Sequence, residues 1–154
     1  MQGGFDAVAF AGQKFEEGYN CAESVLMALD RAWGLGVDPS AGTGLGGGLG
    51  REGHACGALT GGVIALSLSA RAADLSRREA RRQTIARASA LVRWFRERAG
   101  AAECREIVGC DLSSPQGMAR FIREGLKLKV CKPLVQAVVE RLLESEGGTA
   151  GPDG

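Results

Sequence analysis

The sequence predicts an all-α fold, a single-domain helical bundle of about five or six helices with a glycine-rich loop. Apolar residues recur at helical spacing along most of the 154 residues, and no short run alternates between apolar and polar residues as a strand would. The hydrophobic content of 45% and the charged content of 24% are ordinary for a globular protein. One domain over residues 1–146 is expected, followed by a flexible polar tail at 147–154.

The first two helices are expected on either side of a short turn. A stripe of apolar side chains predicts the first helix from about Phe5 to Glu17. Asn20, with Glu23 three residues later, forms a capping box, which predicts that the second helix begins at Cys21. Cys21 would then lie in the first turn of that helix.

A glycine-rich segment and a buried helix follow. The segment from Gly34 to Gly53 is expected to be a loop, because glycine favours a mobile backbone and close approach of the chain. The next helix, over about Ala55 to Ala70, is too short and too rich in small polar residues to span a membrane. Gly57 and Gly61 share one face of it, where another backbone, or a bulky cofactor, could approach closely.

The second half of the chain is also predicted to be helical. Ser76 begins another capping box, ahead of a long basic helix over about 77–99 whose arginines should be solvated. A short helix or turn is expected at 101–110. The pair Ser114-Pro115 is typical of a helix start, and the last helix is expected to begin at Cys131.

Charge and composition limit the functions to consider. The formal net charge of +1 gives no reason to expect nucleic acid or an anionic membrane as a partner. No secretory signal and no membrane span are apparent, so a cytoplasmic protein is expected. Cysteines stay reduced in that compartment, and five of them, an odd number, argue against a disulfide framework. The thiols are then inert core residues, ligands of a metal or cluster, or redox groups.

Three of the cysteines fall at or near predicted helix starts: Cys21, Cys56 and Cys131. Unpaired amides and the helix dipole favour the thiolate at such positions. Their spacing does not indicate a particular kind of site. The chain has neither a C-x-x-C pair, as in thioredoxin-like proteins and zinc ribbons, nor the C-x-x-C-H motif that attaches haem c. His54, the only histidine, is expected at the surface, with a second option of tuning the thiol of Cys56.

Four segments of the chain resemble the C_GCAxxG_C_C family of redox-active proteins, which is named after four cysteines. They are GYNCAESVLMAL, GGGLGREGHACGALTGG, CREIVGCDL and KVCKPLV, and the resemblance covers about residues 5–145. The matching thiols, which become candidates for both metal ligands and redox groups, are Cys21, Cys56, Cys104 and Cys131. The resemblance also implies cofactor-binding positions at Gly57, Ala58 and Gly61. Cys110 falls outside the pattern and is expected to be a buried or accessory thiol.

The resemblance implies a helical fold that gathers four cysteines for redox work, with an iron–sulfur cluster as the expected cofactor and electron transfer to an unknown redox partner as the expected function. Three alternatives stay open. The protein could be a thiol–disulfide oxidoreductase or sensor using a pair such as Cys21 and Cys56, a structural zinc protein, or a helical interaction module without a site. Whether it is an enzyme is left open, and its apolar faces also permit a homodimer.

Overall fold

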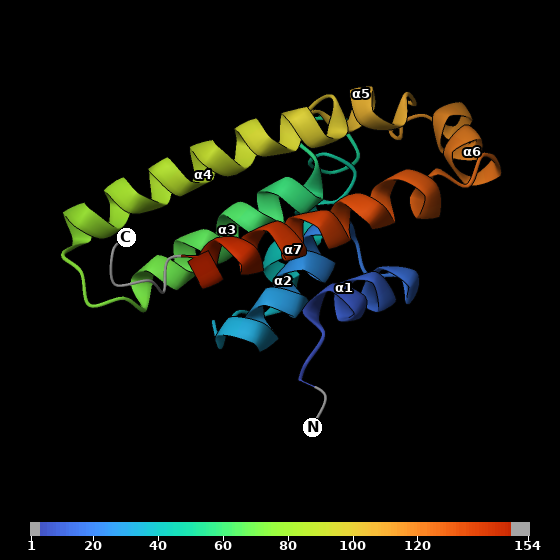
Figure 1. Ribbon diagram of the computed structural model, residues 1–154. Coiled ribbons are helices and arrows are strands. Elements are labelled where there is room, and N and C mark those ends of the chain that lie inside the picture. The colour runs from blue at the N-terminus through green and yellow to red at the C-terminus, as the bar shows by residue number, and fades with distance from the viewer. Residues whose placement is uncertain (1–3, 149–154) are drawn as a thin grey trace.

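The computed structural model describes residues 4–148, which are mostly helical (Figure 1). Seven α-helices occur in these residues, together with a 3₁₀-helix (η1) and a π-helical turn (η2). In chain order they are α1 (Ala7–Glu16), α2 (Cys21–Trp33), η1 (Pro39–Leu45), α3 (Gly57–Arg71), α4 (Arg77–Ala99), α5 (Cys104–Val108), α6 (Pro115–Arg123), η2 (Lys127–Cys131) and α7 (Lys132–Gly148). The all-α prediction is confirmed, since residues 4–148 contain no strand.

The seven α-helices outnumber the five or six predicted because the segment 101–110, expected as a short helix or turn, contains the separate helix α5. Helix α6 begins at Pro115 with Ser114 as its cap, as predicted. The predicted glycine-rich loop also contains η1, which begins where the Asp38 carboxylate accepts a hydrogen bond of 2.8 Å from the Ser40 amide. Helix α7 continues to Gly148, two residues into the predicted tail. The rest of that tail, 149–154, lies outside the described residues.

Two helices begin where their capping residues predict. The Asn20 side chain accepts a hydrogen bond of 2.8 Å from the Glu23 amide, and the Glu23 carboxylate accepts one of 2.9 Å from the Asn20 amide. This capping box starts α2 at Cys21. Ser76 accepts from the amide three residues later in the same way and starts α4 at Arg77.

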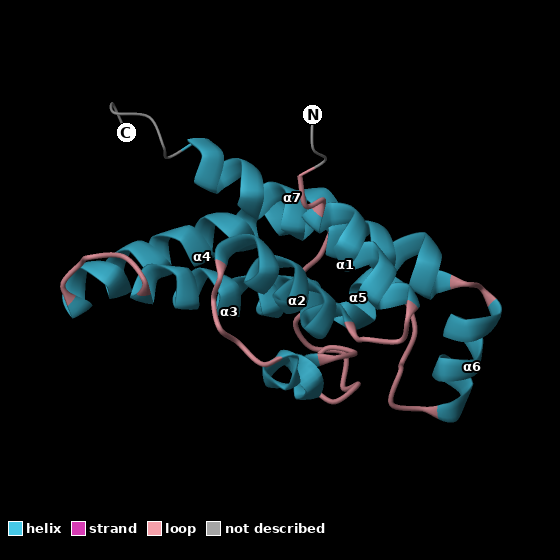
Figure 2. Cartoon of the chain, turned by 90° about the horizontal axis from the view of Figure 1, so that it is seen from below, coloured by secondary structure: helices cyan, strands magenta, loops and turns pink. Residues whose placement is uncertain are grey.

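Helices α2, α3 and α7 pack against one another and form the centre of the molecule. Helix α1 covers α2 and α7 on one side, and the long helix α4 lies along α3 on the other (Figure 1). The short helix α6 stands apart at one end of the bundle (Figure 2). None of the helices described is long and apolar enough to cross a bilayer.

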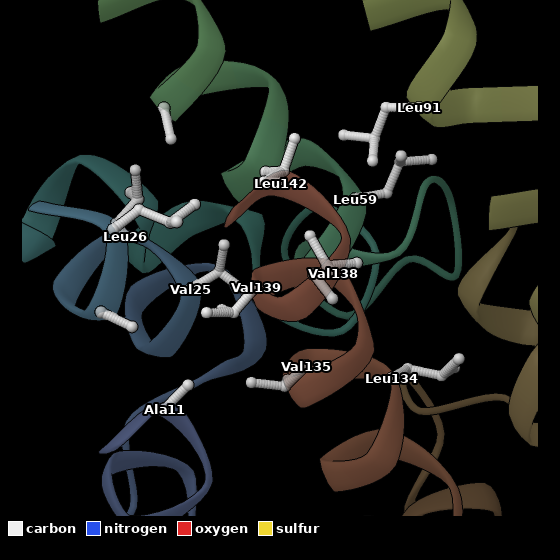
Figure 3. Packing of buried hydrophobic residues seen from close by; sticks show 14 of the residues in the cluster. Ala11, Val25, Leu26, Leu59, Leu91, Leu134, Val135, Val138, Val139 and Leu142 are labelled. Atoms are coloured by element: carbon white, nitrogen blue, oxygen red, sulfur yellow. The ribbon is translucent and has the colours of Figure 1, made fainter. Parts of the chain in front are cut away.

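The main core lies between α2 and α7. Val25 and Leu26 of α2 face Val135, Val138 and Val139 of α7, and all five are fully buried (Figure 3). Burial of such side chains contributes about 1.5–3 kcal/mol each, which fixes α7 against the N-terminal helices without any disulfide. Residues from α3 and α4 extend the same cluster.

Glycines bring α3 unusually close to α2. A Cβ atom at Gly61 would lie 2.9 Å from the carbonyl oxygen and 3.0 Å from the Cα of Ala22, closer than side chains normally approach. At Gly57 it would lie 3.1 Å from the Cβ of Cys21. The sequence allowed two reasons for these glycines, close approach of another backbone or of a cofactor. The structure shows close helix packing at both positions.

We expect Gly61→Ala to destabilise the protein by about 1–3 kcal/mol, because the added methyl group must push α3 away from the α2 backbone. Urea or thermal unfolding measures this. Gly44→Ala is the matched control, since nothing lies within 4 Å of its Cβ position, and it should change stability by less than about 0.5 kcal/mol. Equal losses in both variants would contradict the packing argument.

Candidate functional site

Four of the five cysteines line one cavity of about 430 Å³. They come from four different elements: Cys21 is the first residue of α2, Cys56 the N-cap of α3, Cys104 the first residue of α5, and Cys131 the last of η2. The fifth, Cys110, is buried beside the cavity and does not line it; its thiol donates to the Val108 carbonyl at 3.4 Å. All five thiols are free.

A pair of antiparallel segments holds Cys56 next to Cys104. The amide of Cys56 donates to the Ala102 carbonyl at 2.9 Å, and the amide of Cys104 donates to the His54 carbonyl at 2.7 Å. These bonds flank the single bridge between residues 55 and 103. The bridge joins the start of α3 to the start of α5, so two thiols far apart in sequence meet through backbone hydrogen bonds.

Gly48 belongs to this arrangement, although sequence reasoning did not single it out. Its φ is 73°, and a Cβ there would lie 2.5 Å from the His54 carbonyl oxygen and 2.8 Å from the Cys104 Cβ. Only glycine combines the left-handed backbone with this close approach. The position within a run of glycines was the only signal in the sequence.

The glycine-rich loop is tied to the start of α2. The side-chain amide of Asn20 donates to the carbonyls of Gly42 at 3.2 Å and Thr43 at 2.9 Å, and the Thr43 hydroxyl donates to the Glu23 carboxylate at 3.0 Å. The residues that cap α2 therefore also fix the loop over Cys21.

The expectation that Cys131 starts a helix is wrong, because η2 runs into α7 without a break. Pro133 has no amide hydrogen to donate, and proline is tolerated in the first turn of a helix, so its position favoured a helix start near Cys131. The chain instead forms a π-helical turn, in which the Lys132 amide donates to the Lys127 carbonyl five residues earlier. The helix continues through Pro133 into α7. Cys104, for which no helix start was predicted, occupies one.

The thiols have unequal acidities because their neighbours differ. Hydrogen bonding from the Cys21 thiol, together with the amides of Ala58 and Leu59, lowers the pKa of Cys56 in spite of its burial. Hydrogen bonding with Cys131 and then with Cys56, added to burial, holds the pKa of Cys21 well above its ordinary value. Cys56 is thus the better stabilised thiolate of the pair.

Burial has the opposite result at Cys104. Loss of solvation is the largest cause that raises the pKa of Cys104 to about 12, and negative charge on Cys56, Cys131 and Cys110 adds to it. Cys104 is therefore a neutral thiol over the physiological pH range when no cation is bound to it.

The remaining predicted site residues lie in different places. Gly57 lines the cavity, whereas Gly61 packs on Ala22 and the buried Ala58 offers its amide to Cys56. His54 does not line the cavity; its imidazole is largely exposed, with Nδ1 3.7 Å from the Glu103 carboxylate. The lining by Lys127 and by apolar side chains of α5 and α6 was not predicted from the sequence.

Among residues 4–148, no three His, Cys, Asp or Glu side chains are arranged around one point as the ligands of a single metal ion. The four cysteines line one cavity, and the Cys21 thiol interacts with both Cys131 and Cys56. This arrangement suits a group larger than one ion, or chemistry between pairs of thiols.

We expect iodoacetamide to alkylate Cys56 at lower pH than Cys21 or Cys104 in the reduced, metal-free protein. A lowered pKa leaves the nucleophilic thiolate populated at lower pH, whereas raised values delay it at the other two thiols. Mass spectrometry of peptides labelled between about pH 6 and 10 measures the three rates. Faster labelling of Cys104 than of Cys56 at neutral pH would contradict the assignment.

A family of known proteins matches most of the chain. The family described as "Putative redox-active protein (C_GCAxxG_C_C)" matches residues 19–145, which confirms the resemblance drawn from the cysteine segments. No curated protein and no solved structure matches the chain.

Proposed function

Because the chain belongs to the C_GCAxxG_C_C family of redox-active proteins, we propose that its four cavity cysteines hold an iron–sulfur cluster and that the protein transfers electrons to a redox partner. One observation carries the proposal: four thiols from four separate elements converge on a single cavity, and the fifth is left out. Four cysteine thiolates are the usual ligand set of such clusters.

The donor set and the space both fit this group. A single zinc ion needs four donors about one point, at about 2.3 Å for sulfur. A cluster has several iron atoms, so its ligands lie around a volume. The cavity of about 430 Å³ offers that volume, which favours the cluster over structural zinc.

The protein supplies the surroundings of the thiols. The cluster, when bound, would take up and release one electron at a time. The amides of Ala58 and Leu59 would continue to donate to the Cys56 sulfur and make reduction easier, as hydrogen bonds to ligand sulfur do. The apolar side chains of Val108 and Leu134, both buried, keep water from this side of the cavity.

Protein purified without oxygen should contain iron and acid-labile sulfide and show a visible band that dithionite bleaches. Cys104→Ser and Cys56→Ser should each lose most of the iron, whereas Cys110→Ser should keep it. Iron and sulfide analysis per folded protein measures this. Equal retention in all three variants, or zinc alone in the wild type, would refute the proposed ligands.

A second candidate function rests on a separate observation, the interaction of the Cys21 thiol with Cys56. Cys56, with the lowered pKa, would attack a substrate disulfide, forming a mixed disulfide and releasing one thiolate. Cys21, after losing its proton, would then attack the Cys56 sulfur and release the second thiolate. The products are a Cys21–Cys56 disulfide and two reduced substrate thiols, so the protein would be a thiol–disulfide oxidoreductase.

This candidate predicts a trapped intermediate. In metal-free Cys21→Ser the resolving thiol is absent, so a small disulfide should remain attached to Cys56 in a stable mixed disulfide. Wild-type protein should instead form the Cys21–Cys56 disulfide, which peptide mass mapping identifies. Cys110→Ser is the control and should behave as the wild type. Equal accumulation of the mixed disulfide in all three proteins would exclude the pair.

A further inference from the structure

The cavity opens to solvent between the α1–α2 turn and the glycine-rich loop. The exposed residues that line it all belong to these two segments; they are Gly18, Tyr19, Thr43, Gly50 and Arg51. The thiols of Cys56 and Cys104 lie among its buried lining. A small molecule therefore has a way in from one side.

Two of the side chains that line the cavity are cationic and none is acidic, although the chain has 18 Asp and Glu. Arg51 stands at the exposed rim. The Nζ of Lys127 lies 5.0 Å from the centroid of the Phe15 ring, a buried ring that also lines the cavity, and this cation–π contact fixes the charge there. Within residues 4–148 neither cation forms an ion pair with a carboxylate.

The two charges are not used by the thiols either. The shifted pKa values of Cys21, Cys56 and Cys104 arise from other thiols, from burial and from backbone amides, and neither cation contributes to them. A pair of cations beside a cavity, without a carboxylate partner, is the arrangement that recognises an anion from outside.

The backbone at Arg51 is strained. Its φ is 68°, in the left-handed region, where a residue other than glycine is strained. Leu49, at 65°, shares this conformation, and the other neighbours with a positive φ, at 47, 48, 50 and 53, are glycine. Replacement of Arg51 by glycine would therefore remove the charge and relieve backbone strain at the same time.

Another wall of the cavity is apolar and comes from α5 and α6. Ile107, Met118 and Phe121 line it, all of them partly buried. A ligand that satisfies both walls carries a negative charge at one end and an apolar body. A volume of about 430 Å³ lies in the range of about 300–1,000 Å³ that is usual for small-molecule sites.

We propose that the cavity is a binding site for a small organic anion, with its charged group between Arg51 and Lys127 and its apolar body against the side chains of α5 and α6. Such a ligand would lie in the same cavity as the cysteines. It would therefore be positioned for electron transfer or thiol–disulfide exchange at those cysteines. The inference rests on the cations and the cavity and concerns the metal-free protein, because a bound cluster would take up part of the same space.

A pair of matched dyes tests this proposal on the metal-free full chain, in which no cluster can occupy the cavity. Anilinonaphthalene sulfonate is an aromatic anion, and phenylnaphthylamine has the same aromatic body without the charge. We expect the anionic dye to bind with saturable fluorescence at one site per chain. The double variant Arg51→Gln with Lys127→Gln should weaken it about tenfold or more and leave the neutral dye unchanged.

Two further variants separate charge from folding. Lys129→Gln removes a nearby exposed cation that does not line the cavity, and it should not change binding of either dye. Arg51→Gly should raise the thermal unfolding midpoint by relieving backbone strain, yet weaken binding of the anionic dye several-fold. The proposal is overturned by failure of the anionic dye to saturate, by equal weakening of both dyes, or by equal effects of Lys129→Gln and the double variant. None of these outcomes depends on whether the protein binds a cluster, because the chain is metal-free in every measurement.

Discussion

The backbone contact between α2 and α3 is the constraint on which the cysteine cavity depends. Gly61 lies so close to Ala22 that a Cβ atom there would meet the carbonyl oxygen at 2.9 Å, and a Cβ at Gly57 would make a tight contact of 3.1 Å with Cys21. Because Cys21 is the first residue of α2 and Cys56 is the cap of α3, the contact that packs the two helices also brings their thiols together. The packing of α2 against α3 therefore also forms this part of the site, and glycine at positions 57 and 61 is needed for both.

The other two thiols reach the cavity through different interactions. Backbone hydrogen bonds between the segments 53–56 and 102–105 position Cys104, with Gly48 leaving room for its Cβ. A π-turn presents Cys131 from within a helix that the valine core anchors against α2. A helix–helix contact, a backbone bridge between distant segments and a π-helical turn therefore each bring cysteines to the cavity. Each cysteine depends on its own local structure.

The sequence was sufficient for the features that depend on neighbouring residues. Helical periodicity predicted the all-α class, and the capping residues Asn20 and Ser76 predicted where α2 and α4 begin. It was not sufficient where distant segments decide the outcome. The amide of Cys104 bonds to His54, some fifty residues away, and this pairing starts α5 at a position without a capping side chain. The widened turn at Cys131 likewise replaced the helix start that local patterns favour.

The placement of Cys104 bears on which redox group the cavity serves. Amide donors at Cys56 stabilise negative sulfur equally well in a free thiolate and in a cluster ligand, so they do not separate the two candidates. A dithiol mechanism needs only Cys21 and Cys56. Yet a glycine in the left-handed conformation and a non-local bridge hold Cys104 in the same cavity, where burial and neighbouring thiols raise its pKa to about 12. A thiol so hard to ionise is a poor nucleophile but becomes a thiolate when a metal binds it, which favours the four-thiol cluster site.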